Sequence, residues 1–186
     1  MEQEVSSEAL IPLLAGCAPE AAPDRIKELA ALLEPFLRSI PQALSVAIQM
    51  TKSRGSSRAV AFATGQALDY LFDEDDLLPE RDFGILGLLD DAYLAHIYAG
   101  MLSRMYPQVD TSGTGYQPPD ERTLNVVRSL LPAGIASALE RTVDNLLLVA
   151  HSLFGSGGGA EGHPSQPAPV LQVSEAIRAM DSAGIR

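Results

Sequence analysis

A nearly apolar stretch, residues 83–106, is the feature that most restricts how this chain can fold. A helix that is apolar on every side has to be buried, so we expect this stretch to form the central helix of the protein. Its only acidic residues, Asp90 and Asp91, are adjacent. Neighbouring helical positions point about 100° apart, so at least one carboxylate should face other helices. An unpaired carboxylate removed from water costs several kcal/mol, and this one therefore needs a partner.

The rest of the chain favours an all-α fold, a compact multi-helix bundle around that central helix. Ala and Leu are abundant, and Pro and Gly separate the apolar stretches, which is typical of helices joined by turns. We predict one helical domain over residues 1–154, with a loop at 107–119 and a long helical segment at 120–154 that Pro132 kinks or breaks. The other expected helices cover 5–15, 24–38, 41–53, 57–72 and 83–106.

The C-terminal part is predicted to be a tethered helix. Residues 155–169 are rich in Gly, Ser and Pro, a composition typical of a flexible linker. In residues 170–186 an apolar stripe recurs at helical spacing, formed by Val170, Val173, Ile177 and Met180. Such an amphipathic helix can dock on its own body or on a partner.

Charge and cysteine content exclude several classes of protein. The chain has a net charge of −11, which argues against a nucleic-acid-binding protein, because that binding depends on Lys and Arg. Anionic membrane surfaces are disfavoured for the same reason. A single cysteine, Cys17, rules out an internal disulfide framework, and the N-terminus lacks the basic start of a secretory signal. We therefore expect a cytoplasmic protein.

Most of the negative charge lies in one segment. Residues 69–91 contain nine acidic residues and one basic residue, Arg81, and so carry −8 of the −11. The segment reads Tyr-Leu at 70–71, Asp-Leu-Leu-Pro-Glu at 76–80 and Gly-Leu-Leu-Asp-Asp at 87–91. This pattern resembles the YkvA-like bacterial family of unknown function over about 25 residues, although Glu80 replaces an Asp and Phe83 a Pro. The resemblance implies a small helical domain, attached to membrane segments in some relatives.

Two interpretations of the acidic segment stay open. In the first, Asp90 or Asp91 pairs with Arg81, Arg58, a Tyr hydroxyl or the backbone of residues 73–82, and so locks that turn to the central helix. In the second, Asp90 or Asp91 joins Asp73, Asp76 or Glu80 in a divalent-metal site. Such oxygen ligands suit Mg²⁺, Mn²⁺ or Ca²⁺. The first interpretation is the preferred one.

Other chemistry-bearing residues give weaker signals. His96 is expected to be a buried, satisfied histidine, and no nucleophile elbow or phosphate-binding loop is present in the sequence. The one basic cluster contains Lys52, Arg54 and Arg58, and at the start of a helix it could hold an anion.

Taken together, these patterns favour a soluble helical interaction or scaffold module that binds a protein partner or a second copy of itself, without catalytic residues or a cofactor. The alternative is a divalent-metal protein, a metal-dependent hydrolase centred on Asp76, Glu80, Asp90 and Asp91. A second alternative is a protein associated peripherally with membranes.

Overall fold

The computed structural model describes residues 5–53, 58–71, 77–78 and 80–154, and all regular secondary structure in these ranges is helical. The predicted all-α fold is therefore confirmed. The elements are α1 (Ser7–Cys17), α2 (Pro23–Arg38), α3 (Ile40–Lys52), α4 (Arg58–Leu71), α5 (Glu80–Phe83), the 3-10 turn η1 (Gly84–Gly87), α6 (Leu88–Met105), the 3-10 turn η2 (Ser112–Thr114), α7 (Glu121–Leu130) and α8 (Ile135–Phe154). The predicted linker and C-terminal helix lie outside the described residues.

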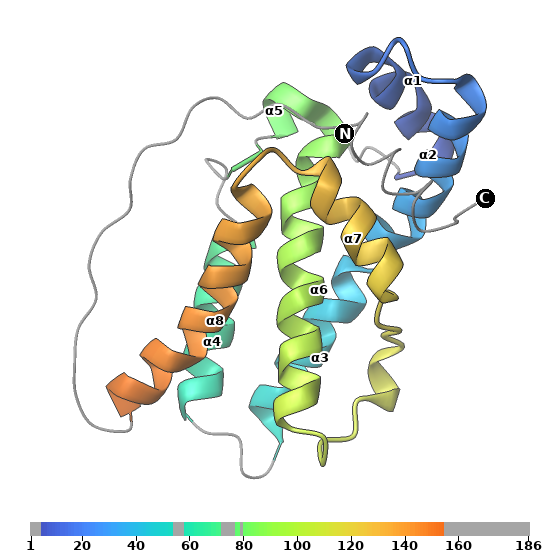
Figure 1. Cartoon of the computed structure of the whole chain (residues 1–186). Coiled ribbons are helices and arrows are strands. Elements are labelled where there is room, and N and C mark those ends of the chain that lie inside the picture. The colour runs from blue at the N-terminus through green and yellow to red at the C-terminus, as the bar shows by residue number, and fades with distance from the viewer. Residues whose placement is uncertain (1–4, 54–57, 72–76, 79, 155–186) are drawn as a thin grey trace.

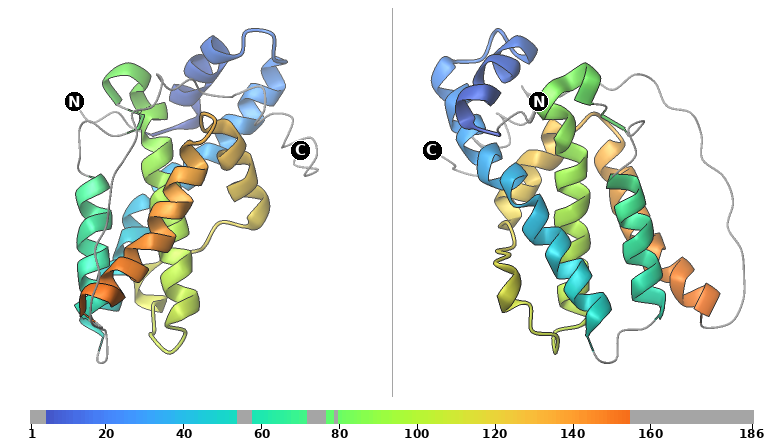
Figure 2. Two further views of the ribbon diagram at one scale, coloured as in Figure 1. Left: turned by 60° about the vertical axis from the view of Figure 1, so that its left-hand side comes forward. Right: turned by 180° about the vertical axis from the view of Figure 1, so that it is seen from behind.

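Helix α6 lies at the centre of the bundle, as expected for the most apolar segment. It contacts α2, α3, α4, α7 and α8, and Figures 1 and 2 show it enclosed by these helices. Several of its large apolar side chains are fully buried, among them Leu89, Leu94 and Leu102. The segment Gly84–Met105 is long and apolar enough to cross a membrane, but 78% of its most apolar window is buried inside the protein. Core helices of soluble proteins have this character too.

The predicted helix 83–106 is wrong at its beginning. The chain instead forms the short helix α5, then η1, and α6 begins only at Leu88. Gly84 has φ 58°, a left-handed conformation that side chains other than glycine rarely adopt, and it ends α5. Asp90 and Asp91 consequently lie in the first turn of α6 rather than in its middle. At this end of a helix the helix dipole favours negative charge.

Proline and glycine set the other main boundaries. Pro35 is accommodated inside α2, and the chain bends at Ser39 before α3, which carries Pro41 in its first turn. The break expected at Pro132 separates α7 from α8, and Gly134 in this turn has φ 88°. Asp120 caps α7 by accepting a hydrogen bond from the backbone N–H of Thr123 at 2.7 Å.

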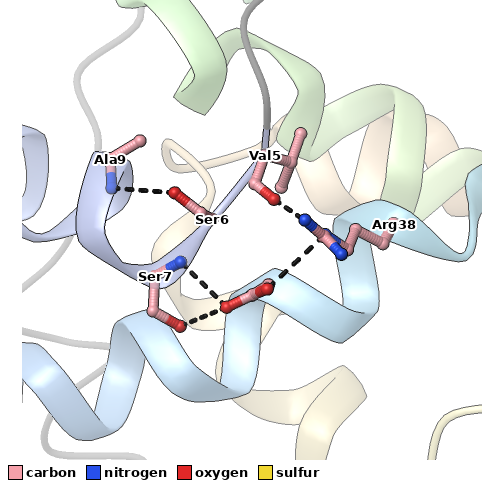
Figure 3. Close-up of polar contacts among 6 residues, drawn as sticks. Val5, Ser6, Ser7, Ala9 and Arg38 are labelled. Atoms are coloured by element: carbon pink, nitrogen blue, oxygen red, sulfur yellow. Dashed lines mark hydrogen bonds and ion pairs between the residues drawn. The ribbon is translucent and has the colours of Figure 1, made fainter.

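Helix α1 packs on α2 at one end of the molecule (Figures 1 and 2). The carboxylate of Glu34 in α2 accepts hydrogen bonds from the backbone N–H of Ser7 at 2.8 Å and from its hydroxyl at 2.5 Å. Arg38 lies 3.5 Å from the same carboxylate and donates from Nε to the carbonyl of Val5 at 2.7 Å (Figure 3). These contacts fix the start of α1 to the last turns of α2.

Candidate functional site

Both aspartates of the central helix are buried, which confirms that at least one carboxylate is withdrawn from water. Asp90 is 0% exposed and Asp91 6%. The hydroxyl of Tyr70, near the end of α4, donates to Oδ2 of Asp90 at 3.0 Å. A tyrosine hydroxyl was one of the partners that the sequence predicted. Both aspartates also have further polar interactions.

The other predicted partners of Asp90 and Asp91 either lie far from the two carboxylates or lie outside the described residues. Arg58 begins α4 and Tyr70 lies near its end, so about 18 Å of helix separates Arg58 from the aspartate site. Arg58 is exposed and was a wrong choice of partner. The side chain of Arg81 and residues 73–76 lie outside the described part of the chain. Pairing with them stays a prediction.

The structure brings only part of the predicted metal ligand set onto one element. Asp90 and Asp91 share the first turn of α6, whereas Asp73, Asp76 and the side chain of Glu80 lie outside the described residues. Among the residues that are described, no group of three His, Cys, Asp or Glu side chains could hold a metal ion. A divalent-metal site with the missing ligands stays a prediction.

A second buried polar cluster surrounds His96 of α6, which is 2% exposed as expected for a satisfied core histidine. Its Nε2 lies 3.0 Å from the carbonyl of Phe36 and 3.1 Å from Oγ of Ser39, and its Nδ1 lies 3.1 Å from the hydroxyl of Tyr116. The ring also packs against those of Phe36 and Tyr116, with centroids 4.4 and 5.6 Å away. His96 thus joins the α2–α3 bend and the 107–119 loop to the central helix.

The hydrogen-bond roles in this cluster follow from chemistry. The carbonyl of Phe36 can only accept, so Nε2 of His96 carries a proton and donates to it. Burial lowers the pKa of His96, and the ring is then neutral, with Nδ1 accepting from the hydroxyl of Tyr116. Ser39 donates to the carbonyl of Phe36 at 2.9 Å. A protonated Nε2 cannot remove a proton from Ser39, so the pair is structural and not a nucleophile with its base.

Directly beside this cluster the surface is hollowed into a groove of about 600 Å³, here called the elbow groove. One wall comes from the α2–α3 bend and the other from the end of the 107–119 loop and the start of α7. Its lining is Leu32, Pro35, Phe36, Arg38, Ser39, Gln42, Gly115, Gln117, Pro118, Pro119 and Thr123. Sequence analysis did not identify this site. The available signal was the Tyr-Gln-Pro-Pro run at 116–119, where aromatic and proline residues follow one another in a loop.

A third polar cluster ties α6 to α7 and α8. The hydroxyl of Tyr93 donates to Oε1 of Glu140 at 2.7 Å, and Arg128 contacts both oxygens of Glu140, at 2.9 and 3.1 Å. Burial and the neighbouring Glu140 carboxylate raise the pKa of Tyr93 well above its usual range. The hydroxyl therefore stays protonated and keeps donating at physiological pH.

The remaining predicted residues are dispersed. Lys52 ends α3 and Arg58 begins α4, both exposed, while Arg54 lies outside the described residues. Anion binding by this cluster stays a prediction. Cys17 is free and exposed at the end of α1, and partial burial raises the pKa of its thiol. A raised pKa disfavours the thiolate, the reactive form of cysteine.

Comparison of the chain with protein-family models, with curated proteins and with solved structures gives no match in any of the three. The resemblance to the YkvA-like family therefore stays a prediction that depends on residues 70–91 alone.

Proposed function

We propose that this protein is a soluble helical interaction module and that the elbow groove binds a short segment of a protein partner. The observation that carries the proposal is the groove itself. Its volume of about 600 Å³ lies within the range of ~300–1,000 Å³ that is typical of ligand sites. Its apolar part, formed mainly by Leu32, Phe36 and three prolines, suits apolar side chains of a partner.

Support comes from the way in which the walls are held. Phe36 and Ser39 of one wall are hydrogen-bonded to His96, and Tyr116, next to the opposite wall, is bonded to the same ring. A groove whose walls are fixed before binding loses less conformational entropy when it binds. Prolines at 118 and 119 add stiffness, because their φ angles are fixed.

The polar residues of the groove indicate what kind of segment it suits. Gln42 and Gln117 are exposed, and each amide can both donate to and accept from a peptide backbone. The chain as a whole carries −11, so long-range repulsion disfavours an acidic partner. We propose a neutral or basic segment with at least two apolar side chains.

The test is a blocking substitution with a matched control. Gln42→Trp places an indole over the groove, whereas Gln49→Trp makes the same change at an exposed position of α3 outside it. A protein that co-purifies with the wild-type chain would be produced separately and titrated by calorimetry. We expect Gln42→Trp to raise its Kd at least tenfold and Gln49→Trp to change it less than twofold. Equal binding by the wild type and Gln42→Trp would contradict the proposal.

A divalent-metal protein is the second proposal, and one observation favours it. Two carboxylates, those of Asp90 and Asp91, are withdrawn from water within one helical turn. Cation binding is one way in which a protein compensates such burial. Hydrogen bonding of the kind that Tyr70 supplies to Asp90 is the other, and we prefer it.

A further inference from the structure

We infer that the protein's own C-terminal segment, residues 170–183, occupies the elbow groove in the resting chain, so that a partner has to displace it. This inference rests on the proposed function of the groove. It would make the C-terminal segment an internal competitor, and the binding of a partner would be regulated by whatever removes the segment.

The chain beyond α8 is long enough to reach the groove. Residues 155–169 can span at most about 50 Å when fully extended. Helices α8 and α7, about 30 and 15 Å long, leave their common turn as the two legs of a V (Figure 1). Thr123, in the first turn of α7, lines the groove. The end of α8 and the start of α7 therefore lie closer together than the two legs and their turn laid end to end, a length of the same order as the extended linker.

The chemistry of the segment matches that of the groove. In a helical conformation Val170, Val173, Ile177 and Met180 would form one apolar stripe, suited to the apolar lining around Phe36. Residues 170–183 contain two acidic side chains and one basic side chain, and Arg186 adds a second basic side chain just beyond them. The segment therefore carries a net charge of only −1, and the acidic body repels it weakly. An acidic partner segment would meet stronger repulsion.

Covalent attachment favours the C-terminal segment over a segment of a separate protein as the occupant of the elbow groove. A tethered segment reaches an effective concentration on the order of 1 mM near its site when the average length of the linker matches the span, and a lower one when the linker has to stretch. A contact with an intrinsic Kd below this effective concentration is populated in the intact chain. A partner without such attachment has to bind more tightly than the tethered segment in order to displace it.

The experiment compares hydrogen exchange in three forms of the full chain. Ile177→Asp places a charge in the apolar stripe, and Ala179→Asp places the same charge about 200° away on the helix. We expect the backbone amides of residues 115–117 and 38–42 to exchange at least threefold faster in Ile177→Asp than in the wild type. Ala179→Asp should match the wild type, and amides of α6 should be equal in all three. Equal exchange at the groove in wild type and Ile177→Asp would overturn the inference.

Measurements of partner binding and of oligomeric state distinguish a failure of this inference from a failure of the proposed function. If the inference holds, Ile177→Asp tightens the binding of a partner whose Kd is weakened by Gln42→Trp. If Gln42→Trp weakens that binding while Ile177→Asp changes neither binding nor exchange, the inference fails and the proposed function stands. If Gln42→Trp has no effect on the partner but Ile177→Asp still exposes the groove, the proposed function fails instead. A wild-type dimer in sedimentation that Ile177→Asp dissociates would show exchange of the segment between copies and would overturn docking within one chain.

Discussion

The hydroxyl of Tyr70 lies 3.0 Å from Oδ2 of Asp90 and donates a hydrogen bond to it. This contact joins the end of α4 to the first turn of α6 and supplies a donor to a carboxylate that is 0% exposed. Residues 71–89 connect the two residues along the chain, so the bond joins the two ends of the segment 69–91, which carries most of the protein's net charge. We regard this hydrogen bond as one of the contacts that allow two consecutive acidic residues to be buried in an apolar helix.

Removing the Tyr70 hydroxyl should therefore destabilise the protein. Tyr70→Phe leaves the buried Asp90 carboxylate with one donor fewer, and the loss of a partner from a buried charged group costs about 1–3 kcal/mol. Urea unfolding of both proteins at pH 7 measures this difference. Tyr106→Phe removes a hydroxyl from a partly exposed tyrosine at the other end of α6 and should cost less than about 0.5 kcal/mol. Equal costs for the two variants would show that the contact contributes nothing.

Stability should depend on pH through His96. Burial lowers the pKa of His96 below its ordinary value of 6.5, so between the folded and the unfolded pKa the unfolded chain binds more protons than the folded one. The contribution of neutral His96 is therefore complete above pH 6.5 and is lost as the pH falls through the folded pKa. Protonation would also oblige the Tyr116 hydroxyl to accept from Nδ1 instead of donating to it.

The measurement is the free energy of unfolding between pH 5 and 8 for the wild type and His96→Gln. The wild type minus variant difference should be constant above pH 6.5 and should shrink below it. Subtraction of the variant removes the contributions of the other two histidines. A difference that grows as the pH falls would mean that the folded protein favours the charged ring, contrary to the assigned tautomer.

The contact between Ser7 and Glu34 should hold α1 on the bundle. Hydrogen bonds from the Ser7 hydroxyl and backbone lower the pKa of Glu34, so its carboxylate keeps this contact at neutral pH and loses it as the pH falls below 4.5 through the folded pKa. Ser7→Ala should speed hydrogen exchange in α1 and leave α6 unchanged. Ser45→Ala, which removes a hydroxyl bonded to a carbonyl within α3, is the control. Faster exchange throughout the protein would contradict a local role.

The Tyr93, Glu140 and Arg128 cluster should show coupling between its members. Tyr93→Phe leaves Glu140 without the donor from α6, and the double variant with Glu140→Ala should cost less than the two single changes added together. We expect a coupling free energy of about 0.5–3 kcal/mol, the range for residues in one network. Arg128→Ala should cost less than about 1 kcal/mol, because the Arg128 side chain is half exposed. Additive effects of Tyr93→Phe and Glu140→Ala would contradict a shared network.

Local patterns predicted much of this fold. Apolar spacing and proline positions located α2, α3, α4, α7 and α8 to within a few residues, and the burial of Asp90, Asp91 and His96 followed from their apolar neighbours. The division of the residue 83–106 segment was missed because a continuous apolar run does not reveal that Gly84 adopts a left-handed conformation. The elbow groove could not be predicted, since Phe36 and Pro118 are brought together only by the tertiary structure.

The central claim is that protein contacts, not a bound cation, compensate the burial of Asp90 and Asp91. The most direct test is the thermal midpoint of the wild type and of the Asp90→Asn, Asp91→Asn double variant in EDTA, Mg²⁺, Mn²⁺, Ca²⁺ and Zn²⁺. A ligand that binds only the folded state stabilises it by RT ln(1 + [L]/Kd) and so raises this midpoint. We predict the same wild-type midpoint in EDTA and in each cation. A rise with one cation that the double variant lacks would contradict the claim and establish the metal protein instead.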